Sequence, residues 1–208
     1  RVRFTMTTRG VSIRSSRVKS RPKRRGVASV RKYSGVAARN RAFAEAEAAG
    51  VTLLALIDDD EWPAAGWLEA LVAARRATGA AVVGGLVGPV FPVEAEVRLS
   101  RHARFWSVLP QARGWLPFVH ATSNVLVDLA QIADVPRPLF AEEHGLSGGG
   151  DLVFFSRLHA RGKAMAWADG AAVFEEVPPS RASLDWLKQR RFRVGNHMVM
   201  DEELRQGR

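Results

Sequence analysis

The sequence predicts an α/β domain in which helices flank a mixed, mainly parallel sheet. The main observation is that helical segments alternate with short runs of purely apolar residues, the order expected when crossover helices join strands. The apolar runs contain no charged residues, as is typical of strands buried on both faces. The chain has 208 residues, of which 47% are hydrophobic, so we expect one domain with a sizeable core.

The first clear elements are two helix–strand pairs. Residues 36–49 are rich in Ala, Glu and Arg and end before Gly50, which predicts a helix. The run 51–57 is apolar except for Thr52 and lies between a glycine and acidic residues, so it predicts a buried parallel strand. Residues 66–78 form an amphipathic pattern that a glycine ends, and residues 80–90 predict a second buried strand.

The second half of the chain is less regular. A final helix is expected through 183–198, with Ser180 or Ser183 as its cap after Pro178 and Pro179. The other expected elements are loops and short strands in 91–120, a strand at 121–127, a short helix at 150–161, and one or two strands within 163–177.

Residues 1–34 differ in character from the rest. They hold 12 of the 31 Lys and Arg residues and none of the 21 Asp and Glu residues. The net charge of +10 therefore belongs to this segment, because 35–208 is close to neutral. A basic block without helical periodicity is typical of a solvated tail. We expect a poorly ordered or non-native head at 1–34, a folded domain at 35–200 and a tail at 201–208.

Several classes of function are disfavoured. The near-neutral body and the lack of aromatic residues interleaved with the basic ones argue against a nucleic-acid partner. Without cysteine there is no thiolate metal site, and the five histidines lack metal-ligand spacing. No phosphate-binding glycine loop or nucleophile elbow is present. No apolar run approaches the roughly 20 residues of a membrane span, and no signal peptide is visible, so we expect a cytoplasmic protein.

The most informative motif is Asp58-Asp59-Asp60-Glu61, directly after the predicted strand 51–57. Ligands of open α/β sheets bind at the carboxyl ends of strands. Adjacent carboxylates repel one another, and a hard divalent cation relieves that repulsion. Mg²⁺ and Mn²⁺ commonly combine one or two carboxylates with substrate phosphates. The motif therefore favours a metal–diphosphate site, with an acidic surface turn as the alternative.

A second candidate is Asp151, which follows three glycines and opens the predicted helix 150–161. A carboxylate at this position could accept a proton from a bound hydroxyl. The structural alternative is a helix N-cap.

Basic residues provide the third candidate. Arg190, Arg191 and Arg193 could face a diphosphate, or they could form the solvated face of a basic helix. Arg39 and Asn40 lie near the start of the helix 36–49, and a helix N-terminus suits anions, although both could equally be structural.

Taken in order, five segments resemble the family 2 glycosyltransferases, which are inverting enzymes of the GT-A fold, a Rossmann-like nucleotide-sugar-binding fold. They cover most of the chain between residues 35 and 196. The acidic motif in its context and the Gly-Asp segment are the specific parts of the resemblance. The segments are GVAARNRAFAEA (35–46), LLALIDDDEWPAAGWLEALV (53–72), TSNVLV (122–127), GGGDLVFFSRLHARG (148–162) and WLKQRRFRVGN (186–196).

The resemblance implies a role for each candidate. Asp60 would hold a divalent cation, Mn²⁺ or Mg²⁺, on the donor diphosphate, and Asp58 would contact the nucleotide or assist the metal. Asp151 would be the base that deprotonates the acceptor hydroxyl. The other implied donor-binding residues are Asp59, Arg39, Arg190, Arg191 and Arg193, and those implied at the sugar or acceptor are Asn124, Gly149, Gly150, Trp106 and Trp115.

The implied reaction is a single displacement with inversion. The acceptor oxygen would attack the anomeric carbon of a nucleotide-sugar donor while the metal stabilises the departing diphosphate. The acceptor would be a saccharide or a lipid-linked saccharide, and in the latter case the protein could associate peripherally with the inner face of the membrane.

The sequence departs from the family in two places. Gly150 stands where the family usually has an acid before the base. Segment 1–34 shows none of the family's first strands or the acid that follows them, so we expect these strands to be missing or atypical and donor binding to be impaired. The alternatives are a nucleotidyltransferase of similar fold and a non-catalytic basic protein whose binding through 1–34 is sensitive to salt.

Overall fold

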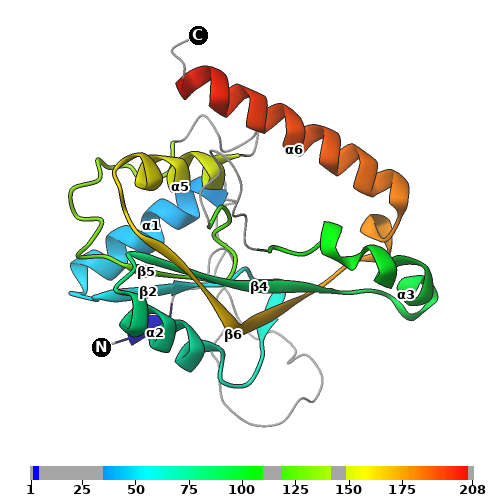
Figure 1. Ribbon diagram of the computed structural model, residues 1–208, viewed down its shortest axis with the longest axis horizontal. Coiled ribbons are helices and arrows are strands. Elements are labelled where there is room, and N and C mark those ends of the chain that lie inside the picture. Colours follow the sequence, from blue (N-terminus) through cyan, green and yellow to red (C-terminus); the bar gives the residue numbers. More distant parts are fainter. Residues whose placement is uncertain (1, 5–34, 110–118, 142–148, 206–208) are drawn as a thin grey trace, which may run out of the picture.

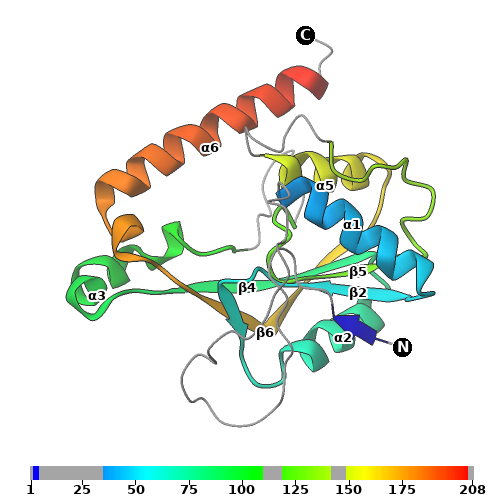
Figure 2. The ribbon, with the colours of Figure 1, turned by 180° about the vertical axis from the view of Figure 1, so that it is seen from behind.

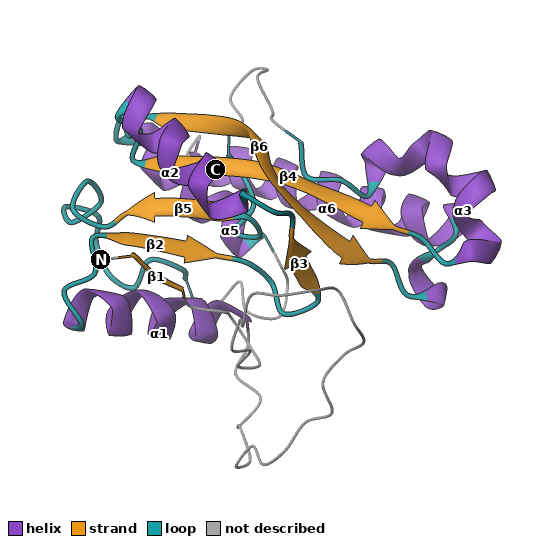
Figure 3. Cartoon of the chain, turned by 90° about the horizontal axis from the view of Figure 1, so that it is seen from below, coloured by secondary structure: helices purple, strands orange, loops and turns teal. Residues whose placement is uncertain are grey.

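A computed structural model describes residues 2–4, 35–109, 119–141 and 149–205 of the chain. Its six strands form one sheet in the order β1-β2-β5-β4-β6-β3, and Figure 3 shows the central strands side by side. The strands are β1 (Val2–Phe4), β2 (Leu53–Leu56), β3 (Glu61–Pro63), β4 (Val82–Val90), β5 (Val125–Asp128) and β6 (Met165–Glu176).

The sheet is mixed. β1 pairs with β2 and β4 with β6 in parallel, whereas β5 runs antiparallel to both β2 and β4, and β3 antiparallel to β6. Antiparallel pairings are thus the more numerous in the described sheet, a difference from the mainly parallel arrangement expected. Apolar runs on neighbouring strands indicate burial and do not encode strand direction, which explains the difference.

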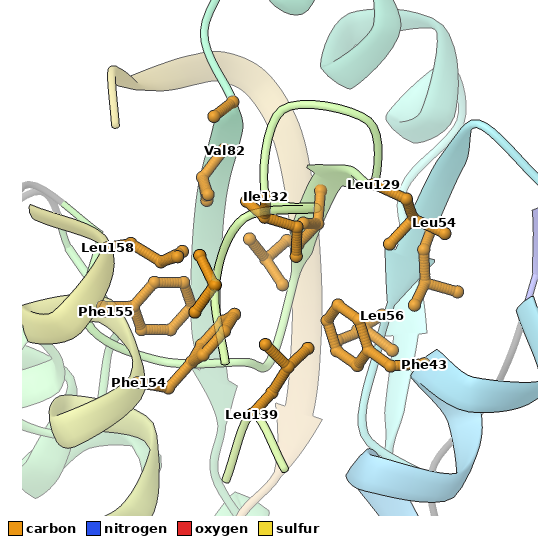
Figure 4. Close-up of a cluster of buried hydrophobic side chains, with 14 of the residues drawn as sticks. Phe43, Leu54, Leu56, Val82, Leu129, Ile132, Leu139, Phe154, Phe155 and Leu158 are labelled. Carbon is orange, nitrogen blue, oxygen red and sulfur yellow. The ribbon is translucent and has the colours of Figure 1, made fainter. Parts of the chain in front are cut away.

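Helices cover both faces of the sheet (Figures 1 and 2). α1 (Gly35–Ala48) and α5 (Gly150–Ala160) lie together on one face, and α2 (Trp67–Thr78) lies on the other. Figure 4 shows the core on the first side, where Phe43 and Phe154 pack with ring centroids 5.9 Å apart. This packing fixes the first turns of α1 and α5 near each other.

A separate small core forms where β4 and β6 extend beyond the other strands (Figure 1). It joins α3 (Val93–Leu99), the 3-10 helix η1 (Ser100–Phe105) and α6 (Leu184–Arg205), with a second 3-10 turn, η2 (Pro179–Arg181), before α6. Within it Trp106 meets Phe91 edge-on and stacks on Trp186. The expectation of loops and short strands in 91–120 was therefore wrong for the described part, which is mainly helical because Ala95 and Leu99 are buried here.

The other expected elements are present with shifted ends. The predicted strand 121–127 begins only at Val125, because Asn124 adopts a left-handed backbone conformation with φ 56°. The one or two strands expected within 163–177 are a single strand, β6 (Met165–Glu176). Ser183 caps α6 by accepting a hydrogen bond from the Trp186 amide at 3.1 Å, as one of the two cap predictions had it. α6 continues to Arg205, into the predicted tail.

Segment 1–34 contributes one described element. Val2–Phe4 pairs in parallel with Leu53–Ala55 as an outer strand of the sheet. The sequence predicted that the first strands are missing or atypical, and this three-residue edge strand is the described part of the segment. Residues 5–34 lie outside the described residues.

Candidate functional site

The candidate site lies where the first turns of α1 and α5 meet the carboxyl end of β2. α1 carries Arg39, the turn after β2 carries Asp58, and α5 carries Asp151 in its first turn. Arg39 Nη1 lies 3.3 Å from Asp151 Oδ1, and its Nη2 lies 3.8 Å from Asp58 Oδ1. One guanidinium thus joins two carboxylates from distant parts of the sequence.

The Asp151 carboxylate is held by the segment that leads into β5. Its Oδ2 accepts hydrogen bonds from the Thr122 amide at 3.0 Å and from the Thr122 hydroxyl at 2.7 Å. The N-cap of α5 is Gly149, with φ 83° and no side-chain cap. Asp151 therefore does not act as the N-cap, because its carboxylate bonds to Thr122 and Arg39. Both oxygens have partners that fix their direction.

Two of the acids after β2, Asp58 and Glu61, have a raised pKa, chiefly because both are buried. Burial raises the pKa of Asp58 to about 6, and repulsion by Asp151, Asp60 and Glu175 adds to this, while attraction to Arg39 opposes it. Burial and then repulsion by Asp58 raise the pKa of Glu61 to about 8, although Glu61 accepts a 3.0 Å hydrogen bond from the Asp58 amide.

Glu175 joins this group from β6. It lies opposite Glu61 in the β3–β6 pairing, and burial followed by repulsion from Asp60 raises its pKa. Asp59 and Asp60 are exposed in the turn after β2. The result is an acidic cluster, Asp58, Asp60, Glu61 and Glu175, whose charges oppose one another with Arg39 as a counter-charge at one side.

These residues fit a divalent cation that is shared with a ligand. Among the described residues, no group of three or more His, Cys, Asp or Glu side chains is arranged to enclose a metal by itself. Mg²⁺ and Mn²⁺ prefer oxygen ligands and often take only one or two carboxylates beside phosphate oxygens. Asp58 and Asp60 offer that donor set, and the exposure of Asp60 leaves it open to a ligand.

Of the three predicted arginines of α6, Arg190 acts on the acidic cluster. Arg190 is among the charges that lower the pKa of Glu175, and its guanidinium lies 5.3 Å from the Trp186 ring centroid. Arg191 is exposed and donates a 2.8 Å hydrogen bond to the Phe105 carbonyl. Arg193 belongs to α6, and its side chain is outside the described part.

Two residues expected at the acceptor are internal. Asn124 has no exposed surface, and its amide accepts a 2.6 Å hydrogen bond from Trp67 Nε1 and donates to the carbonyls of Leu86 and Ala171. Trp106 is buried in the small core described above. Both side chains join elements of the fold in this structure, and their contact with an acceptor stays a prediction.

The remaining acceptor predictions are the glycines and Trp115. Gly149 and Gly150 lie at the start of α5, beside Asp151, where a left-handed residue is required at position 149. Trp115 lies outside the described residues.

Sequence reasoning missed the two side chains nearest Asp151 in the preceding segment. Thr122 is almost fully buried and holds the carboxylate. Burial lowers the pKa of His120, against attraction to Asp151, while Arg191 adds to the lowering. Its Nδ1 is buried without a hydrogen-bond partner. Thr122 begins the segment TSNVLV (122–127), but no role of its own was predicted for it, and His120 lies just before that segment and belongs to no motif.

Comparison with known proteins identifies the family of the chain. The family model for glycosyl transferase family 2 matches residues 9–127, which include the acids after β2 and part of the basic segment 1–34.

The described residues include no helix long and apolar enough to cross a membrane.

One curated relative and one solved structure provide further likeness. The succinoglycan biosynthesis protein ExoM of Rhizobium meliloti (strain 1021) is 40% identical over 147 residues, which are 68% of this chain and 45% of ExoM. The chain thus spans less than half the length of that relative. The crystal structure of a protein named A197 from STIV matches with 16% identity and a TM-score of 0.45 over 67% of this chain and 65% of that one, a likeness too weak to carry an argument. The family match over more than half of the residues, together with the identity to ExoM, shows that the chain belongs to glycosyl transferase family 2.

Proposed function

We propose that the protein transfers a sugar from a nucleotide-sugar donor to an acceptor hydroxyl by a metal-assisted displacement that inverts the anomeric configuration. The observation that carries this proposal is the joining of Asp58 and Asp151 through Arg39. A single displacement needs a base on the acceptor side and a stabilised leaving group on the donor side. In this proposal Asp151 serves the acceptor side of the site and Asp58 serves the donor side.

On the acceptor side, Asp151 is the proposed base. Thr122 and Arg39 orient its carboxylate, so the oxygen that receives the proton has a fixed position. A base held within hydrogen-bond reach of the attacking hydroxyl does not have to be reoriented in the transition state. Gly149, the N-cap of α5, precedes it, and we propose that the lack of a side chain there lets an acceptor approach the start of α5.

On the donor side, Asp58 and Asp60 are the proposed metal ligands. A divalent cation bound there with the donor diphosphate would stabilise the charge that develops on the leaving group. The mutual repulsion of Asp58, Asp60 and Glu175 is relieved by such a cation, which supports this assignment. Asp59, Arg190, Arg191 and Arg193 are proposed to contact the donor from the same turn and from α6.

The partners follow from the same reaction. We propose a saccharide or lipid-linked saccharide as acceptor, within polysaccharide biosynthesis, because the name of ExoM refers to the biosynthesis of succinoglycan. A cytoplasmic location, with peripheral contact to the inner face of the membrane when the acceptor is lipid-linked, remains part of the proposal. The family match favours a glycosyltransferase over a nucleotidyltransferase or a non-catalytic basic protein.

The test is an assay of sugar transfer from a panel of sugar nucleotides in the presence of MnCl₂. Transfer is measured as the release of nucleoside diphosphate. The anomeric configuration of the product is then read by NMR. We expect turnover with inversion in the parent protein and a loss of roughly a hundredfold or more in Asp151→Asn, the scale of general-base catalysis. Glu69→Gln, on α2 at the opposite face of the sheet, is the matched control and should retain activity. A product with retained configuration, or a fully active Asp151→Asn, would exclude the proposed mechanism.

A further inference from the structure

Arg39 holds a position that the sequence did not predict. Its side chain is only 18% exposed, and its guanidinium lies between the carboxylates of Asp151 and Asp58. Its Nε is buried without a hydrogen-bond partner among the described residues. A cation with so little contact with water requires nearby negative charge to remain stable. The two carboxylates therefore account for its place.

The backbone of α1 is adapted to this position. Gly35 lies one turn before Arg39, and a Cβ at Gly35 would lie 3.2 Å from Arg39 Nη1. The guanidinium thus lies against the first turn of its own helix, within ion-pair distance of both carboxylates. This arrangement differs from the role expected from the sequence, in which Arg39 contacts the donor directly.

The charge balance around Asp58 points to a second role. Asp151, Asp60 and Glu175 all repel the Asp58 carboxylate, and Arg39 is the cation that acts against them. A divalent cation bound at Asp58 and Asp60 would supply the same compensation. Arg39 and the metal therefore serve the same carboxylate, and each weakens the other's binding through charge repulsion.

We propose that Arg39 is a positioning residue that takes the place of the divalent cation at Asp58 until the donor binds, and that it afterwards holds Asp151 alone. This inference rests on the proposed function and deepens it, because it assigns an order in which the donor and its metal bind at Asp58 before Asp151 acts on the acceptor. Arg39 lies closer to Asp151, at 3.3 Å, than to Asp58, at 3.8 Å, which fits a contact that is kept with Asp151 and given up with Asp58.

The test uses Mn²⁺ alone as the probe, measured by calorimetry at neutral pH on the parent protein, Arg39→Ala, Arg39→Gln and Arg39→Lys. Removing the positive charge should tighten Mn²⁺ binding by roughly tenfold in the Ala and Gln variants. Arg39→Lys keeps the charge and should bind Mn²⁺ as the parent does. The matched control is Arg41→Ala on the same helix, because Arg41 pairs with Glu45 on the exposed side.

Each result decides the inference. Unchanged or weaker Mn²⁺ binding by a folded Arg39→Gln would overturn it, as would tighter binding by Arg39→Lys. If Arg39→Ala does not fold, as judged by circular dichroism, Arg39→Gln carries the same prediction.

Kinetics separate this role from a direct donor contact. The inference expects a lower kcat in Arg39→Gln with little change in the donor KM, whereas a phosphate ligand would raise that KM. Failure of the proposed function would show as no sugar transfer by the parent while the shift in Mn²⁺ affinity persists. Failure of the inference alone would show as normal transfer by the parent without that shift.

Discussion

The hydrogen bond from the Thr122 hydroxyl to Asp151 gives the sharpest prediction about the base. Thr122→Val keeps the shape of the side chain and removes the donor that lies 2.7 Å from Asp151 Oδ2, while the Thr122 amide remains bonded to the same oxygen. A hydrogen bond to a charged group contributes about 1.5–3 kcal/mol. If that energy orients the carboxylate in the transition state, kcat falls by roughly 10- to 150-fold.

The assay is steady-state transfer at saturating donor and acceptor, with unfolding by urea measured on the same samples. The change should lie in kcat, with acceptor KM little affected, because the base acts when the bond forms. Thr78→Val is the control: it removes a hydroxyl that hydrogen-bonds within α2 on the opposite face, so it should affect stability alone. A folded Thr122→Val with the kcat of the parent would refute the view that Thr122 orients the base.

Three further predictions concern the pH dependence and the supports of the site. Carboxylates whose pKa is raised on folding bind more protons in the folded state. Without metal, the free energy of unfolding should therefore decrease as the pH rises, between pH 3.8 and about 6 for Asp58 and between pH 4.5 and about 8 for Glu61. In urea titrations with EDTA, Glu61→Gln should therefore be more stable than the parent at pH 8, by about 1–2 kcal/mol after screening. Asn124→Ala should lower the free energy of unfolding by about 2–4 kcal/mol, because it breaks three hydrogen bonds, two of them buried. Gly85→Ala should prevent stable folding, since its Cβ would lie 2.2 Å from the Ala171 carbonyl oxygen, as thermal unfolding would show.

The outcomes that contradict these predictions are equally specific. A free energy of unfolding that rises between pH 5 and 8 without metal would contradict the assigned burial of Asp58 and Glu61. A stable Asn124→Ala with a raised acceptor KM would restore Asn124 to the acceptor site. A stable Gly85→Ala would mean that β4 and β6 are further apart at this point.

The positions of the key acids could be predicted because local signals coincide. Asp58 follows an apolar strand, and Asp151 follows glycines that begin a helix. The sequence also placed Arg39 near a helix start. Its pairing with two carboxylates depends on how α1 and α5 pack through Phe43 and Phe154, which no local pattern records.

Other parts of the fold depend on contacts distant in the sequence. The family resemblance implied that Asn124 lies at the acceptor. Its left-handed backbone and its hydrogen bonds to Leu86 and Ala171 could not be predicted, because they exist only in the assembled sheet. Helix α3 did have a local signal, with Pro92 at its N-cap and acids in its first turn. The prolines, glycines and tryptophans around it led us to expect loops there. Strand direction was likewise set by the assembled topology.

The central claim is that the acids after β2 bind the donor diphosphate through a metal. It is tested most directly by calorimetry of nucleoside diphosphates with and without MnCl₂, on the parent protein, on Asp60→Ala and on the control Glu69→Ala. The account predicts Mn²⁺-dependent binding in the parent and the control, and its loss in a folded Asp60→Ala. Binding that is independent of Mn²⁺, or that persists in Asp60→Ala, would contradict it.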